Sequence, residues 1–161
     1  MAISQAMTTS FKAQILLSVH DFRSSGQGST GDTFKISLYT STATVDANST
    51  AYTATNEVTG TNYTAGGNTL TNNGVTATNT NATAGVGWVD FADTTWTTAT
   101  ITARGAMIYN TTPSANTQGN VAATNASVCV LDFGADKTST AGDFTIVFPT
   151  ADSANAIIRI A

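Results

Sequence analysis

Hydrophobic residues gather in short runs near the C-terminal end of this chain. The runs cover 128–133, 144–148 and 156–160, and each is rich in β-branched and aromatic residues. In the second run, Phe144, Ile146 and Phe148 occupy alternate positions, which places them on one face of a strand. Gly, Pro, Asp or Asn bounds each run, as is typical of β-strands. We therefore predict three consecutive strands in this part of the chain.

The same alternation predicts more strands upstream, most clearly at 33–40, where Phe34, Ile36 and Leu38 share a face. The other predicted strands are 69–71, 88–91, 94–102 and 104–110, with turns at 65–68 and 72–74. In total we expect about 8–10 short strands, and no helical patterns alternate with them. This favours a mainly β fold, an antiparallel, jelly-roll-like β-sandwich, over a parallel sheet with crossover helices.

One helix is predicted, at about residues 4–19. Apolar residues recur there at intervals of four and form a stripe, and Ser4 is a plausible N-cap. We expect the whole chain, 1–161, to form a single domain. The helix would pack either on the sandwich of its own chain or on a neighbouring subunit.

Three segments have the composition of connections. The segment 41–63 is rich in Thr, Ala and Asn, and we expect one or two short edge strands within it. The segments 76–87 and 111–125 consist mostly of small and polar residues, and we expect them to be exposed loops.

Charged residues make up only 10% of the chain, and the net charge is −4. Thr supplies about a fifth of all residues, and it suits strands that have a solvated face. Six scattered basic residues do not make a phosphate-binding surface, so we expect no nucleic-acid partner. No apolar run approaches the roughly 20 residues of a membrane span, so we expect no membrane partner.

Residues that could carry chemistry are few. Cys129 is the only cysteine and lies within a strand run, where a buried thiol is the expectation; His20 is the only histidine. The aspartates near strand ends, such as Asp90 and Asp132, lack the spacing of a calcium loop and more often accept hydrogen bonds in turns. We therefore expect no enzyme activity, no metal and no cofactor.

Protein–protein contact is the remaining candidate role. The apolar stripe of the helix and two aromatic residues in predicted strands and loops are our candidate interface. These residues are Ile3, Met7, Phe11, Ile15, Tyr52 and Trp96.

Several stretches resemble small virion structural proteins of tailed bacteriophages. They are the opening residues 1–12, the segments 32–40, 51–53, 63–67, 102–106 and 131–134, and the end 156–160. The resemblance implies a non-enzymatic virion component present in many copies and assembled in the cytoplasm of a bacterial host. The leading hypothesis is a capsid decoration (cement) protein, a trimer or other cyclic oligomer bound to the major capsid protein. The alternative is a tail, fibre or collar component whose loops bind a host-surface glycan.

Overall fold

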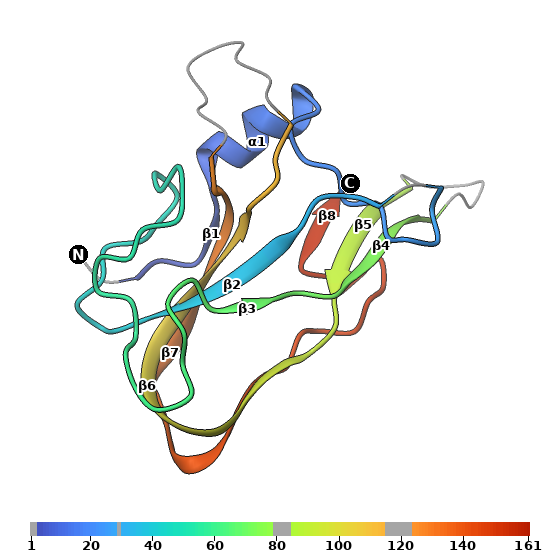
Figure 1. Ribbon diagram of the computed structural model, residues 1–161. Helices are drawn as coiled ribbons and strands as arrows, with labels where there is room; N and C mark the ends of the chain where they lie inside the picture. Colours follow the sequence, from blue (N-terminus) through green and yellow to red (C-terminus); the bar gives the residue numbers. More distant parts are fainter. Residues whose placement is uncertain (1–2, 29, 79–84, 115–123) are drawn as a thin grey trace.

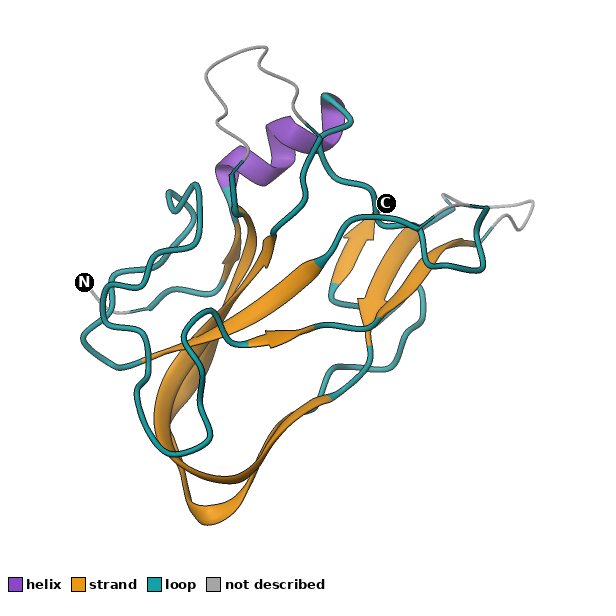
Figure 2. Cartoon of the chain, in the orientation of Figure 1, coloured by secondary structure: helices purple, strands orange, loops and turns teal. Residues whose placement is uncertain are grey.

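The computed structural model describes residues 3–28, 30–78, 85–114 and 124–161. Within them the chain forms one helix and eight strands, arranged in two antiparallel sheets as predicted (Figures 1 and 2). The elements are β1 (Ala6–Met7), α1 (Thr9–Leu16), β2 (Phe34–Tyr39), β3 (Asn68–Thr69), β4 (Asn72–Ala77), β5 (Gly87–Phe91), β6 (Thr94–Asn110), β7 (Ala126–Ile146) and β8 (Ile158–Ile160). The larger sheet has the order β1-β7-β6-β2-β3 and the smaller one β4-β5-β8. The fold class is therefore the predicted one, a mainly β sandwich with an N-terminal helix.

The two longest strands, β6 and β7, form one continuous hairpin. The sequence predicts 94–102 and 104–110 as separate strands and 134–142 as a connection, but these boundaries are wrong. The pairing of β6 with β7 shifts register at four places, including one between Ala103 and Gly105. These irregularities, of the β-bulge type, accommodate the residues that interrupt the alternation of apolar and polar positions, so the strands continue through them. The ion pair between Arg104 Nε and Asp132 Oδ1, 3.0 Å apart, links the two strands beside this bulge.

The hairpin bends at its bulges. Figure 1 shows β6 and β7 turning back at the end of the molecule away from α1. Thr98 has a left-handed backbone with φ of 51°, and its N–H donates to Asp143 Oδ1 at 3.0 Å. Ser139 Oγ donates to the carbonyl of Ala99 at 2.9 Å. These bonds hold the bend, which turns Trp96 towards the core.

The smaller sheet contains a strand where the sequence predicts a turn. Asn72, Asn73 and Gly74 begin β4, which pairs with β5 through a bulge between Asn72 and Val75. Gly74 has a φ of 86°, so the turn-forming residue supplies the bulge rather than a hairpin turn. The loop expected at 76–87 is shorter than predicted, because β4 extends to Ala77 and β5 begins at Gly87. The loop expected at 111–125 corresponds to the interval between β6 and β7. Within these two segments, 79–84 and 115–123 lie outside the described residues.

The helix is shorter than predicted and begins later. Ala6 and Met7 are extended rather than helical, because they pair with β7 as strand β1. The N-cap is therefore Thr8, not Ser4, and the Thr8 side chain accepts the N–H of Phe11. At the other end, Ser18 is left-handed and Val19 N–H donates to the carbonyl of Gln14, which is the hydrogen bond of a Schellman motif.

Side chains are buried on both faces of the larger sheet. One face meets the smaller sheet in the main core, which includes Phe34, Ile36 and Val128. The opposite face is covered by a second cluster that consists of Ile3, Tyr39, Ala43, Val45, Met107 and Val130. The long connection after β2 supplies Ala43 and Val45, and its ladder pairing with the sheet consists of isolated bridges such as Ala51 with Ala126. The connection therefore acts as a cover for the sheet instead of adding the predicted edge strands.

Candidate functional site

Three of the six residues predicted to form an interface are buried inside the chain, and for these the prediction is wrong. Ile3, Phe11 and Trp96 are at most 3% exposed, because Ile3 lies in the second cluster and the other two lie in the main core. The helix thus packs on the sandwich of its own chain, which was the first of the two alternatives. Met7 and Ile15 are half-buried against the main core.

Tyr52, the sixth predicted residue, belongs to a polar network below the connection. Its ring stacks on Tyr109 with centroids 4.8 Å apart, and its hydroxyl donates to Glu57 Oε2 at 2.6 Å. Glu57 Oε1 accepts the Tyr63 hydroxyl at 2.6 Å and the N–H of Gly66 at 2.7 Å. Burial and this carboxylate raise the pKa of both Tyr52 and Tyr63. Since each of these groups has a partner inside the chain, we interpret the network as structural.

An apolar groove lies between the smaller sheet and the helix with the loop that follows it. It has a volume of about 180 Å³. One wall consists of Ile15, His20 and Phe22, and the other of Val75, Gly87, Trp88, Val89, Ile158 and Ile160. A site of this size accepts one apolar side chain, since a cavity of about 150 Å³ lined by aliphatic and aromatic residues takes up benzene.

Exposed hydrophobic residues surround this groove. Val75 and Ile160 line it and are 46% and 59% exposed, while Leu16, which follows the lining residue Ile15, is 86% exposed. The sequence pattern misses all three. Leu16 lies alongside the predicted apolar stripe, and none of the three is among the predicted interface residues. The exposure of Val75 and Ile160 depends on contacts with segments that are distant in sequence.

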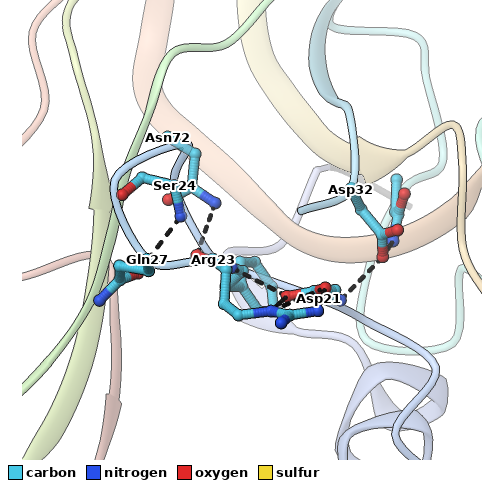
Figure 3. A network of polar contacts seen from close by, with 8 residues as sticks. Asp21, Arg23, Ser24, Gln27, Asp32 and Asn72 are labelled. Atoms are coloured by element: carbon cyan, nitrogen blue, oxygen red, sulfur yellow. Dashed lines mark hydrogen bonds and ion pairs between the residues drawn. The ribbon is translucent and has the colours of Figure 1, made fainter. Parts of the chain in front are cut away.

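A loop between α1 and β2 forms one wall of the groove and is tied to β4. The side-chain amide of Gln27 bonds both backbone groups of Val75: its Nε2 donates to the carbonyl at 2.6 Å, and its Oε1 accepts the N–H at 2.9 Å. This is the pair of hydrogen bonds that a residue of an adjacent strand would form. Asn72 Nδ2 donates to the carbonyl of Phe22 at 2.9 Å. In Figure 3, Ser24, Gln27 and Asn72 lie at one end of this polar network.

The other end of the network closes the loop on itself. Asp21 N–H donates to Asp32 Oδ2 at 2.8 Å, and Asp32 N–H donates to the carbonyl of Asp21, also at 2.8 Å. Arg23 forms an ion pair with Asp21 within this loop (Figure 3). Hydrogen bonds to Arg23 hold the pKa of Asp21 below its usual value. The wall that carries His20 and Phe22 is thus fixed from both sides.

His20, which belongs to this wall, is half-buried, and its ring nitrogens contact side chains of the helix and of β6. Its Nε2 lies 2.9 Å from Gln14 Oε1, and its Nδ1 lies 3.0 Å from Asn110 Nδ2. Burial lowers the pKa of His20 from 6.5 to about 4. The ring also lies 5.0 Å from that of Phe11 and 6.0 Å from that of Phe22. A neutral imidazole in this setting packs as an aromatic residue.

A second cleft lies along β7 at the opposite end of the molecule. It has a volume of about 510 Å³ and mixes polar and apolar residues. Its lining consists of Phe133, Lys137, Thr138, Ser139, Asp143, Phe144, Thr145, Ile146 and Val147. Val147 is 72% exposed. Together with Leu16, Val75 and Ile160, it makes up the set of large hydrophobic side chains that are exposed in the described chain.

The described residues hold no cluster of three or more His, Cys, Asp or Glu side chains that could bind a metal ion. Cys129 is buried as expected, and burial raises the pKa of its thiol to about 12. In the part of the chain that the structure covers, no helix is both long and apolar enough to cross a membrane.

Comparison of the chain with models of known protein families, with curated proteins and with solved structures finds no match.

Proposed function

We propose that this protein is a non-enzymatic structural component of a bacteriophage virion, most specifically a capsid decoration protein. One observation carries the proposal. Of the four large hydrophobic side chains exposed in the described chain, three line two separate clefts, Val75 and Ile160 the first and Val147 the second, and the fourth, Leu16, directly follows the lining residue Ile15. Exposed apolar residues that gather at clefts are typical of protein-binding surfaces. Two such surfaces allow one copy to contact two neighbours at once.

The composition of the surface supports the same proposal. A chain with only 10% charged residues has weak electrostatic repulsion between copies. The polar side chains of Glu57 and Gln27 have partners inside the chain, and the bonds of Gln27 to Val75 hold one wall of the groove in place. Many copies joined by modest interfaces favour the assembled shell by mass action. The resemblance of the sequence to virion proteins agrees with this role.

The copy number in purified particles tests the proposal. A decoration protein is expected in numbers comparable to those of the major capsid protein, which quantitative mass spectrometry of the particles measures. Cryo-electron microscopy should then locate it on the head. If it is found in far fewer copies on the tail, the fibre alternative is correct, and if it is absent from particles the proposal fails.

A second experiment tests the proposed mechanism. Particles made without this protein are mixed with the purified chain, and binding and thermal disassembly are measured. The wild-type chain should bind and should raise the disassembly temperature. Failure to bind such particles would contradict a decoration role.

A further inference from the structure

We propose that Asn73 is a site of spontaneous deamidation and that the neighbouring Asn72 restrains the reaction. The modification proceeds through a cyclic imide formed with the backbone of Gly74, and its only co-reactant is water. The inference concerns a covalent change in the isolated chain. It can therefore fail or succeed independently of any role in a virion.

The sequence favours the reaction at this position. Asn73 is the only asparagine in the chain that is followed by glycine. In deamidation the backbone nitrogen of the following residue attacks the side-chain carbonyl carbon of asparagine, and a side chain on that following residue obstructs the approach. Glycine has no Cβ and adopts backbone angles that other residues avoid, so the nitrogen of Gly74 reaches Cγ of Asn73 most easily.

The structure leaves the side chain of Asn73 free. The pairing of β4 with β5 passes from Asn72 to Val75 and assigns no partner to Asn73 or Gly74. Asn73 is exposed, and its side chain forms no hydrogen bond with another described residue. The amide of Asn72 is occupied at both ends, since Nδ2 donates to the carbonyl of Phe22 and Oδ1 accepts the N–H of Gly74. The two neighbouring asparagines should therefore differ in reactivity.

The glycine that makes Asn73 reactive is required by the fold. Gly74 has a φ of 86°, and an added Cβ would lie 2.6 Å from both Gln27 Oε1 and Ser24 Oγ. These two residues belong to the loop that forms one wall of the groove (Figure 3). A larger residue at this position would push the loop away from β4, so the reactive pair is a consequence of the packing.

One hydrogen bond restrains the reaction. The N–H of Gly74 donates to Asn72 Oδ1 at 2.8 Å. The nitrogen must lose this proton and turn towards Cγ of Asn73 before it can attack, so the bond to Asn72 has to open first. Asn72 therefore lowers the rate in the folded chain without taking part in the chemistry.

The reaction balances without an oxidant or a reductant. A bond forms between Gly74 N and Asn73 Cγ, the bond from Cγ to Nδ2 breaks, and ammonia leaves with the proton from Gly74. Water then opens the imide at either carbonyl, which gives an aspartate or an isoaspartate. Isoaspartate inserts a methylene into the backbone of β4 and should displace Val75 from the side chain of Gln27, which bonds both of its backbone groups.

Incubation of the folded protein for several weeks in mildly alkaline buffer, followed by peptide mass spectrometry, tests the site. Position 73 should gain the mass that converts an amide into an acid, and it should do so faster than any other asparagine. Fragment ions separate position 73 from position 72 and distinguish aspartate from isoaspartate. Asn73→Ser should lose the modification. The proposal is overturned if Asn73 stays unmodified or if another asparagine reacts faster.

Two variants of Asn72 test the restraint. Asn72→Ala removes the acceptor of the Gly74 N–H, whereas Asn72→Asp keeps an acceptor, and both variants lose the donor to Phe22. Asn73 should deamidate about 2- to 10-fold faster in Asn72→Ala than in Asn72→Asp, which is the effect of releasing one hydrogen bond. Circular dichroism should show that both variants are folded. Equal rates would refute the restraining role of Asn72.

Discussion

The side-chain amide of Asn110 lies between His20 and Asp32 and donates to both. Its Nδ2 is 3.0 Å from His20 Nδ1 and 2.7 Å from Asp32 Oδ2, and its Oδ1 accepts the N–H of Thr112. Because Asn110 presents a donor, His20 Nδ1 must accept, and the ring proton resides on Nε2, which donates to Gln14. The imidazole is thereby held neutral by its partners as well as by burial.

This arrangement predicts that stability falls in mild acid. The pKa of His20 is about 4 in the folded chain and about 6.5 in the unfolded chain, so the unfolded state binds the proton more readily. The contribution of His20 is full above pH 6.5 and is lost as the pH falls towards 4, up to about 3 kcal/mol. Urea unfolding at a series of pH values measures this slope.

The control for the His20 prediction is His20→Gln, which keeps a polar side chain but does not titrate. It should be less stable at pH 7 and should show a flatter dependence between pH 6.5 and 4. Equal slopes in the two proteins would assign the acid sensitivity to other groups.

Glu57 should be essential to the stability of the connection after β2. Its carboxylate accepts three hydrogen bonds, from Tyr52, Tyr63 and Gly66. Glu57→Gln replaces one acceptor with a donor and leaves a buried donor unpaired, which should lower the free energy of unfolding by about 2 kcal/mol. Chemical denaturation measures the loss. The exposed Asp136→Asn changes the net charge by the same amount and should have little effect.

Gln27 should control how firmly the groove wall is attached. Gln27→Glu keeps the oxygen that accepts Val75 N–H but removes the donor that binds the Val75 carbonyl. We expect a loss of about 1 kcal/mol and faster hydrogen exchange at Val75. Ser25→Ala lies in the same loop, is exposed, and should exchange like the wild type. Unchanged protection of Val75 in Gln27→Glu would refute this role.

Gly67 should tolerate no side chain. It has a φ of 66°, and an added Cβ would overlap the backbone carbonyl of Ile36 in β2. Gly67→Ala should therefore displace β3 from β2 and lower the free energy of unfolding by about 3 kcal/mol or more. Gly26→Ala is the matched control, since a Cβ there meets nothing within 4 Å. The two variants are compared by thermal unfolding, and similar melting temperatures would contradict the prediction.

The sequence alone determines the strand content and most of the core. Alternation in β2 identifies Phe34, Ile36 and Leu38 as core residues, and all three are at most 1% exposed. The local pattern of apolar residues also predicts that Cys129 is a buried thiol and that a helix lies near the N-terminus. These features are readable because the period of side chains along an element depends only on that element.

Tertiary structure decides where elements end and what remains exposed. The apolar stripe continues through Ala6 and Met7, but pairing with β7 makes these residues a strand, and a Schellman motif without glycine ends the helix at Leu16. The sequence pattern around Phe11 and Trp96 is compatible with a position in the core and also with a position in an interface. Only their packing partners place them in the core, while the same packing leaves Leu16, Val75 and Ile160 exposed around a groove. The physical reason is that burial is a property of contacts between distant segments, and those contacts do not follow from the local spacing of residues.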